Sequence, residues 1–214
     1  MLKDDITATV RLSLTEDLGG EVDPNRDVTA SLIDDDSTDE AAVITREAGG
    51  FCGKAWVEEI YRQLGGDTKI QWFVKDGAKI EPGEQLFVVK GKTRTLLTSE
   101  RTVINFVQTL SAVATETAKY VKEVEGTNCS ILDTRKTPPC MRTAMKYAVT
   151  CGGGKNNRIG LYDMYIIKAR HIKANGSIAQ VIEKARNLHP ELKIEIEIDN
   201  LDELQQLLLK TSSL

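Results

Sequence analysis

The 214-residue sequence has few of the residues that mark a secreted, zinc-binding or membrane protein. It contains two histidines and four cysteines (Cys52, Cys129, Cys140 and Cys151), and no two cysteines have Cys-x-x-Cys spacing. A zinc site and a disulfide scaffold are therefore not expected, and the cysteines should be free thiols in a reducing cytosol. The N-terminus lacks the apolar segment of a signal peptide, and no apolar run approaches the length of a membrane span. These absences predict a cytoplasmic protein without a membrane partner.

Positive charge is also not in excess, because the formal net charge is −4. An acidic chain has no general attraction to nucleic acid or to an anionic membrane, so neither is expected as a partner. A hydrophobic content of 41% is enough for a substantial core in a soluble globular protein. Arginines and lysines that cluster locally in such a chain indicate a pocket for a small anionic ligand.

The first half of the chain has a mixed pattern of helices and strands. A long helix is predicted over residues 98–122, with Ser99 as a possible N-cap. Tight turns are predicted at Asp76-Gly77 and Pro82-Gly83. The other expected elements are helices over residues 5–18 and 55–64 and strands over residues 42–44 and 85–89.

The second half alternates short apolar runs with helical patterns. Strands are predicted at residues 130–132, 164–167 and 194–199, and helices at residues 141–148 and 178–188. This alternation is typical of parallel strands joined by crossover helices. A boundary near Gly126 divides the chain into a domain of residues 1–126 and a βα domain of residues 127–214.

Polar clusters follow the apolar runs of this second half. Because the carboxyl ends of parallel strands lie at one rim of a sheet, these clusters should face a common ligand. The clusters are Asp133–Thr137, Gly152–Arg158, Asp163 and Lys168–His171, and their composition predicts an anion-binding active site. The Gly152–Gly154 run has two interpretations, an anion-binding loop or a helix end, and it is not a P-loop because Asn follows Lys155.

With these residues in view, the chain resembles the quinolinate phosphoribosyltransferases, also called nicotinate-nucleotide pyrophosphorylases (carboxylating). The most specific segments of this resemblance are Asp133-Thr134-Arg135-Lys136-Thr137, Gly152-Gly153-Gly154-Lys155-Asn156-Asn157-Arg158-Ile159-Gly160-Leu161, and Ile167-Lys168. Further similar segments extend from Glu16-Asp17-Leu18 to Leu204, so the resemblance covers nearly the whole chain.

The resemblance implies an N-terminal α/β sandwich of the α+β kind, followed by a partial TIM-like α/β barrel of the type II phosphoribosyltransferase kind. It implies transfer of a phosphoribosyl group from phosphoribosyl pyrophosphate to quinolinate with decarboxylation, a step of NAD biosynthesis. The products would be nicotinate mononucleotide, pyrophosphate and carbon dioxide, and the expected cofactor is Mg2+.

By matching motif positions, the resemblance also implies roles for individual residues. Lys136 and Glu197 would serve the phosphoribosyl side, and they are the residues closest to a catalytic role. The full substrate-binding set would be Arg101, Arg135, Lys136, Asn157, Arg158, Lys168, His171 and Glu197. Arg101 would reach the site of a second subunit, which implies a homodimer, whereas no ligand set for a metal is implied.

The acidic residue Glu197 is favoured over Glu195 by alignment alone, and His189 is interpreted as a helix-end residue.

The sequence departs from the family pattern at several positions. Asn157 replaces the usual histidine, and it can donate a hydrogen bond but cannot carry charge. Pro138-Pro139-Cys140 replaces Thr-Pro-Gly, and Ala169-Arg170 replaces Asp-Asn. The sequence given ends at Leu214 after three βα units, where the family continues with further strands, so we expect a fragment or truncated form.

These departures from the family pattern leave two other functions open. Asn157 and Arg170 are compatible with a related transferase of molybdenum-transport loci that uses another anionic heterocycle. The end at Leu214 is compatible with an inactive remnant that binds phosphate-bearing ligands or a full-length homologue.

Overall fold

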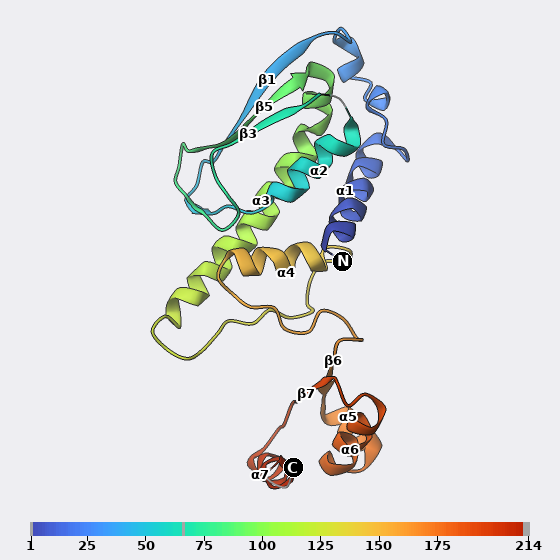
Figure 1. The fold of residues 1–214 in the computed structure, drawn as a ribbon, viewed down its shortest axis with the longest axis vertical. Helices are drawn as coiled ribbons and strands as arrows, with labels where there is room; N and C mark the ends of the chain where they lie inside the picture. The colour runs from blue at the N-terminus through green and yellow to red at the C-terminus, as the bar shows by residue number, and fades with distance from the viewer. Residues whose placement is uncertain (1, 66, 212–214) are drawn as a thin grey trace. The chain divides into compact units, whose positions relative to one another are not determined.

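The computed structural model describes residues 2–65 and 67–211 and divides into two compact units (Figure 1). Unit 1 spans Met1–Asn157 and unit 2 spans Arg158–Leu214. Both units combine helices with strands, which confirms the α/β class. The domain boundary expected at residues 126–127 stays a prediction, because a compact unit need not coincide with a domain. In the part of the chain that is described, no helix combines the length and apolarity needed to cross a bilayer.

Unit 1 is built on a three-stranded antiparallel sheet with the order β1-β5-β3. The strands are β1 (Thr38–Ile44), β3 (Lys69–Trp72) and β5 (Gln85–Lys92). Strand β5 contains four consecutive buried residues because it lies at the centre of the sheet, whereas β1 is mostly exposed. A separate two-stranded ladder pairs β2 (Gly49–Gly50) with β4 (Lys79–Ile80).

Helices α2 (Lys54–Leu64) and α3 (Thr93–Glu123) lie on one side of this sheet, and α1 (Leu2–Leu18) lies beyond α2 (Figure 1). The buried residues of α1 recur at every fourth position, which gives the helix one apolar stripe against its neighbours. The helix ends at Leu18, and the next residue, Gly19, has a φ of 70°, the left-handed conformation that favours glycine. Two short 3-10 helices, η1 (Pro24–Arg26) and η2 (Ala30–Leu32), connect α1 to β1.

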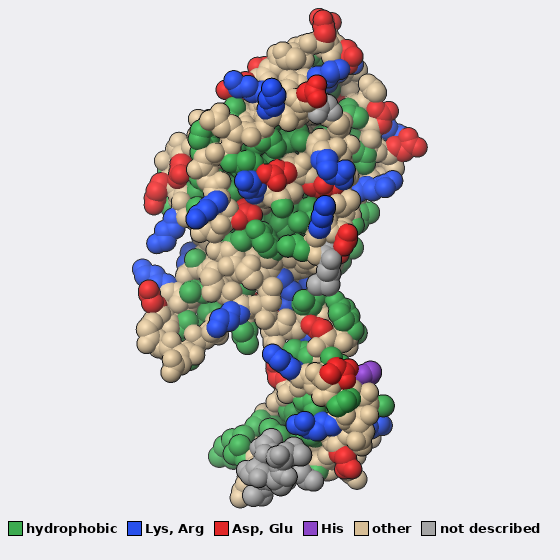
Figure 2. All heavy atoms as spheres, in the orientation of Figure 1, with side chains coloured by type: hydrophobic (Ala, Val, Ile, Leu, Met, Phe, Trp, Pro, Cys, Tyr) green, Lys and Arg blue, Asp and Glu red, His purple; other side chains and the backbone are tan. Residues whose placement is uncertain are grey.

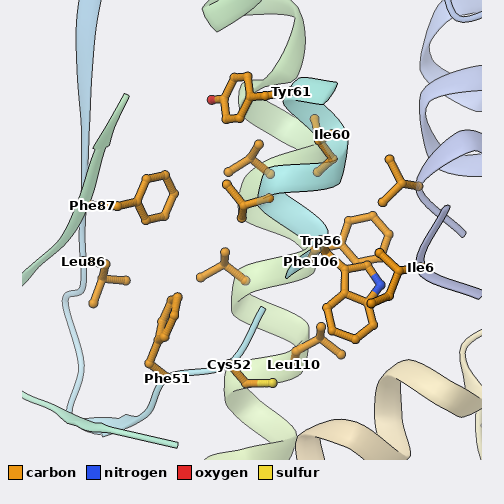
Figure 3. Packing of buried hydrophobic residues seen from close by; sticks show 14 of the residues in the cluster. Ile6, Phe51, Cys52, Trp56, Ile60, Tyr61, Leu86, Phe87, Phe106 and Leu110 are labelled. Carbon is orange, nitrogen blue, oxygen red and sulfur yellow. The ribbon is translucent and has the colours of Figure 1, made fainter. Parts of the chain in front are cut away.

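Aromatic side chains fill the space between the sheet and the helices (Figure 3). Trp56 of α2 is 1% exposed and lies 5.5 Å from Tyr147 and 6.4 Å from Phe106, measured between ring centroids. The ring of Trp72 on β3 contacts the rings of Phe51, which lies before α2, and of Phe87 on β5. The first set of contacts joins α2 to α3 and α4, and the second joins β3 and β5 to the segment before α2. Both sets belong to one hydrophobic core.

The last helix of unit 1, α4 (Arg142–Cys151), packs against α3. At its end, Gly152 approaches α3 so closely that a Cβ atom there would lie 2.4 Å from the Ala114 carbonyl oxygen. Only glycine fits at this position without moving the α3 backbone. The end of α4 is therefore held against the middle of α3.

Unit 2 contains a parallel pair of strands, β6 (Met164–Ile167) and β7 (Lys193–Ile196). They are connected through α5 (Ala169–Asn175) and α6 (Ile178–Leu188), and α7 (Leu201–Thr211) follows β7. Ser177 caps α6, since its side chain accepts a hydrogen bond from the Gln180 backbone N–H. The parallel βα order expected from the sequence is confirmed in this unit.

Two local expectations are wrong. Ser99 is not an N-cap, because α3 begins at Thr93 and the buried Ser99 hydroxyl donates to the Leu96 carbonyl oxygen inside the helix. The apolar residues 130–132 do not form a strand, since their only ladder is an isolated parallel bridge between Leu132 and Lys155. A serine before a helical pattern and a short β-branched run are signals that tertiary packing readily overrides.

Truncation of Leu110, which is fully buried in the middle of α3, should destabilise unit 1 strongly. We expect Leu110→Ala to lower the free energy of unfolding by about 2–5 kcal/mol, because it leaves a cavity in the core. The control Leu97→Ala on the same helix, at a side chain that is 46% exposed, should cost less than about 1 kcal/mol. Urea unfolding followed by tryptophan fluorescence reports on unit 1, where both tryptophans lie. Equal losses in the two variants would contradict the packing described.

Asp27 should give the native state an acid-dependent contribution. Its carboxylate accepts hydrogen bonds from the Ala30 and Thr29 backbone N–H groups and from the Thr98 hydroxyl, and these bonds lower the pKa of Asp27 below its usual 3.8. Because the folded pKa is depressed, the stabilisation is present above the unfolded pKa and is lost as pH falls through the folded one.

We therefore expect Asp27→Asn to cost about 1 kcal/mol at neutral pH and nothing in strong acid. Unfolding measured across this pH range checks the expectation, with Asp36→Asn at an exposed position as the control. A cost of Asp27→Asn that does not change with pH would contradict it.

Candidate active site

A buried ion pair organises the polar segments of unit 1. The Lys146 ammonium group contacts Asp133 Oδ1, and the two side chains are only 3% and 5% exposed. The same Asp133 oxygen accepts a hydrogen bond from the Asn157 backbone N–H at 2.9 Å. Its other oxygen accepts from the Asn156 side-chain amide at 2.6 Å, in the amide orientation that satisfies both groups. Asp133 thus connects its own segment to helix α4 and to the segment at residues 156–157.

The backbone at this position completes the connection. The Lys155 N–H donates to the Ile131 carbonyl oxygen at 2.8 Å, and the Asp133 N–H donates to the Lys155 carbonyl oxygen at 3.1 Å. The two segments therefore run side by side, although they are far apart in the sequence. Lys146 was not among the residues expected in the site. The signal for it is a lysine within the buried face of α4, between Ala144 and Ala148.

The glycine run after α4 is a helix end. The N–H groups of Gly152, Gly153 and Gly154 donate to the carbonyl oxygens of Ala148, Thr150 and Val149. Because all three donors are used within the chain, they do not form an anion-binding loop. Of the two interpretations left open by the sequence, the structure supports the helix end.

Arg135 and Lys136 are placed differently, as expected for neighbours in an extended segment. Residues 131–137 alternate between half-buried and exposed, so Arg135 is half-buried and Lys136 is exposed. Within the described residues, the buried Arg135 Nε has no hydrogen-bond partner. A buried donor without an acceptor is costly, and an anionic ligand would satisfy it.

Arg101 lies on the exposed side of α3, next to the buried residues Thr102 and Val103. Thr102 donates a hydrogen bond to an Asp17 carboxylate oxygen at 2.6 Å and so ties α3 to α1. On the face seen in Figure 2, basic and acidic side chains are interspersed and do not form an extended basic surface.

In unit 2, a compact turn follows Arg158. The Arg158 Nε donates to the Gly160 carbonyl oxygen at 2.5 Å. Asp163 closes the turn, because its carboxylate accepts from the N–H groups of Ile159 and Gly160 at 2.7 and 3.0 Å. Burial acts to raise the pKa of Asp163, but these N–H donors outweigh it and lower the pKa below its usual value. Asp163, one of the polar clusters seen in the sequence, thus shapes the turn that carries Arg158.

Lys168 and Glu197 meet where β6 and β7 end. Each follows the last residue of its strand, and the Lys168 Nζ lies 2.6 Å from Glu197 Oε1. Both side chains are partly exposed, at 39% and 52%, so the pair is accessible to a ligand. His171 supports it, since its Nδ1 accepts a hydrogen bond from the Lys168 backbone N–H at 3.0 Å. The structure thus brings three of the expected site residues together in unit 2.

The remaining expected residues divide between the units. Arg101, Arg135, Lys136 and Asn157 belong to unit 1, and Arg158 belongs to unit 2. His189 is the C-cap of α6, as the sequence indicated.

Removing the charge of Asp133 should destabilise unit 1, because Lys146 would remain buried without its counter-charge. We expect Asp133→Asn to lower the free energy of unfolding by about 3–5 kcal/mol, and the double variant with Lys146→Met to recover part of that loss. The control Lys119→Met removes an exposed ion pair with Glu116 and should cost less than about 1 kcal/mol. Denaturant unfolding of the four proteins checks this, and a loss for Asp133→Asn no larger than that of the control would contradict it.

Known structures share this architecture. The nicotinate-nucleotide pyrophosphorylase of Francisella tularensis is 43% identical with a TM-score of 0.86, over 95% of this chain and 70% of that protein. NadC from Streptococcus pyogenes is 32% identical with a TM-score of 0.87, over 94% of this chain and 70% of that protein.

Curated sequences give the same result. The nicotinate-nucleotide pyrophosphorylase (carboxylating) of Mycobacterium leprae is 36% identical over 210 residues, which cover 96% of this chain and 72% of that relative. The chloroplastic enzyme of the same name from Oryza sativa is 38% identical, and the match spans 55% of its length.

Family models cover nearly the whole chain. The N-terminal domain of quinolinate phosphoribosyl transferase matches residues 27–111, and its C-terminal domain matches residues 113–213. Together with the relatives and the solved structures, these matches show that the chain belongs to the quinolinate phosphoribosyl transferase family.

Proposed function

We propose that this chain transfers the phosphoribosyl group of phosphoribosyl pyrophosphate to quinolinate, with decarboxylation. The products are nicotinate mononucleotide, pyrophosphate and carbon dioxide, and the step belongs to NAD biosynthesis. Membership of the family supports this reaction. The observation that carries the proposal is the accessible pair of Lys168 and Glu197 at the ends of two parallel strands.

The substrates require several fixed cations. Quinolinate carries two carboxylates, which arginine forks bind with two parallel hydrogen bonds and lysine binds as a point charge. In this proposal Arg101, Arg135, Arg158 and Lys168 bind quinolinate, and Asn157 donates a hydrogen bond beside them. The buried Arg135 Nε supports this assignment, because a substrate carboxylate would satisfy it.

Lys136 and Glu197 serve the phosphoribosyl side. Lys136 is exposed and suits a phosphate, and Glu197 can accept hydrogen bonds from the ribose hydroxyls. Binding of a substrate carboxylate at Lys168 would replace part of its contact with Glu197, which frees Glu197 for the ribose. His171 positions Lys168 through the backbone contact described above.

The reaction needs no protein nucleophile. As pyrophosphate departs, positive charge develops on the anomeric carbon of the ribose, and the pyridine nitrogen of quinolinate attacks that carbon. The nitrogen becomes quaternary, and the adjacent carboxylate leaves as carbon dioxide while the electron pair of the broken carbon–carbon bond stays on the ring carbon next to the positive nitrogen. That carbon then takes a proton from solvent, which gives nicotinate mononucleotide. The residues of the chain contribute by holding the two substrates in line and by stabilising the anionic groups.

Magnesium is part of this proposal. The Glu197 carboxylate is a hard oxygen donor, is half exposed and keeps one oxygen free of the Lys168 contact, so it fits a Mg2+ ion carried by the pyrophosphate group. The ion would neutralise charge on the leaving group. We also propose a homodimer, in which the exposed Arg101 reaches the site of the partner subunit, and a cytosolic location, which suits four free thiols.

The first test is product formation by the purified chain. We expect nicotinate mononucleotide, followed by chromatography, on incubation with quinolinate, phosphoribosyl pyrophosphate and Mg2+. Lys168→Met should lower kcat/KM for quinolinate by about 100-fold or more, because it removes a charge that holds the substrate and transition state. The control Lys184→Met, at an exposed position of α6, should leave the rate unchanged.

A folded chain that binds phosphoribosyl pyrophosphate but forms no product would contradict the proposal and favour a ligand-binding protein without activity. Product formation with another anionic heterocycle, and none with quinolinate, would favour a related transferase.

A further inference from the structure

Unit 1 contains a second group of reactive side chains that the proposed function does not use. Cys52, Asp76 and Cys151 come from three segments, which are the turn before α2, the turn between β3 and β4, and the end of α4. The two sulfur atoms and a carboxylate oxygen all lie within 4.8 Å of one another. Figure 3 shows Cys52 at the edge of the core next to Leu110. We call these three residues the Cys-Asp cluster.

Each residue of the Cys-Asp cluster is held by its own hydrogen bonds. The backbone of Cys52 is fixed on α3, because its N–H donates to the Ser111 hydroxyl at 3.0 Å and its carbonyl oxygen accepts from that hydroxyl at 3.2 Å. The Cys52 side chain is fully buried, whereas Cys151 is partly exposed. Cys151 therefore gives a small ligand a route from solvent to the cluster.

The Asp76 carboxylate is oriented by three donors. Its Oδ1 accepts from the N–H groups of Gly53 and Lys54 at 2.9 and 3.1 Å, and its Oδ2 accepts from the Tyr147 hydroxyl at 2.8 Å. Gly77 lets this turn approach α4, since its φ is +82° and a Cβ there would lie 3.2 Å from the Cys151 carbonyl oxygen. Carboxylates that bind metals are themselves oriented by such outer hydrogen bonds.

The sulfur atoms of Cys52 and Cys151 lie within 4.8 Å of each other. A hydrogen bond from Cys52 lowers the pKa of Cys151, and the same bond, together with burial, raises the pKa of Cys52. The pKa of Tyr147 is raised by burial and by its bond to Asp76, so the hydroxyl stays protonated and continues to donate.

We propose that Cys52, Asp76 and Cys151 form a binding site for a thiophilic divalent cation of the zinc type. Two sulfurs and one carboxylate oxygen are ligands that Zn2+ accepts, and three protein ligands leave a fourth position for water. Sulfurs bound to one tetrahedral zinc ion lie about 3.8 Å apart. Because the two sulfurs lie within 4.8 Å of each other, small side-chain rotations reach that distance. Binding releases the two thiol protons to solvent. The ion would cross-link three segments of unit 1 and is separate from the Mg2+ of the proposed reaction.

The test measures metal binding by the full chain, in a background where the exposed thiols are removed by Cys129→Ser and Cys140→Ser. The chain is freed of metal with a chelator under reducing conditions and titrated with Zn2+ against a coloured competitor. Cd2+ is titrated in parallel, and its thiolate absorption reports coordination by sulfur. We expect one ion per chain and a higher Tm with Zn2+, because the ion binds only the folded state.

Variants separate the cluster from adventitious binding. Cys151→Ser, at the partly exposed position, should weaken Zn2+ binding by more than about 100-fold and abolish the Cd2+ band and the Tm shift. Tyr147→Phe should weaken binding by about 10–100-fold, the usual cost of losing an outer hydrogen bond. Should Cys52→Ser fail to fold, the Cys151 and Tyr147 variants still decide the question.

Either of two results would overturn the proposal. One is Zn2+ binding that Cys151→Ser leaves unchanged, which would place the ion elsewhere. The other is that the reduced chain does not bind Zn2+. If mass spectrometry then also shows that the two thiols form a disulfide when reductant is omitted, the cluster is a disulfide pair and not a metal site.

Discussion

Burying an ammonium group as deeply as that of Lys146 costs free energy unless a carboxylate lies beside it, and Asp133 provides that carboxylate. This requirement constrains much of unit 1. It holds the middle of α4 against the segment at residue 133, and through the Asn157 N–H and the Asn156 amide it holds the segment before Arg158. Arg135 and Asn157 therefore lie on irregular segments that are attached to this ion pair, whereas Arg101 lies on α3.

Helix α3 packs against the sheet, α2 and α4 and so fixes their positions within unit 1. The close contact between Ala114 and Gly152 sets where α4 ends. Ser111 of the same helix holds Cys52, and Cys151 closes α4 nearby. The Lys146–Asp133 pair and the Cys-Asp cluster thus depend on the same helix packing, the first through the middle of α4 and the second through its last residue.

Several elements could be predicted because their signals are local. The apolar stripes of α1 and α6, the turns at Gly77 and Gly83, and the strand β6 follow from periodicity and from glycine conformations that few other residues adopt. The position of Lys168 at the end of β6 could also be predicted, because it directly follows a short apolar run. Glu197 was expected inside a strand over residues 194–199, whereas β7 ends at Ile196 and Glu197 follows it. The strand expected at residues 130–132 is absent from the described structure, because this segment pairs with the chain only through a single bridge between Leu132 and Lys155. No local sequence pattern reveals that pairing.

The sequence by itself determined the family, the α/β class and the basic residues that suit an anionic substrate, since these depend on residue types in a linear order. Tertiary structure alone decided three further matters. It paired Lys146 with Asp133, it used the N–H groups of the glycine run to end α4, and it brought Cys52, Asp76 and Cys151 together. The physical reason is that burial and hydrogen-bond partners are set by residues distant along the chain. Cysteine spacing argued against a metal site, whereas the proximity created by folding is what supports one.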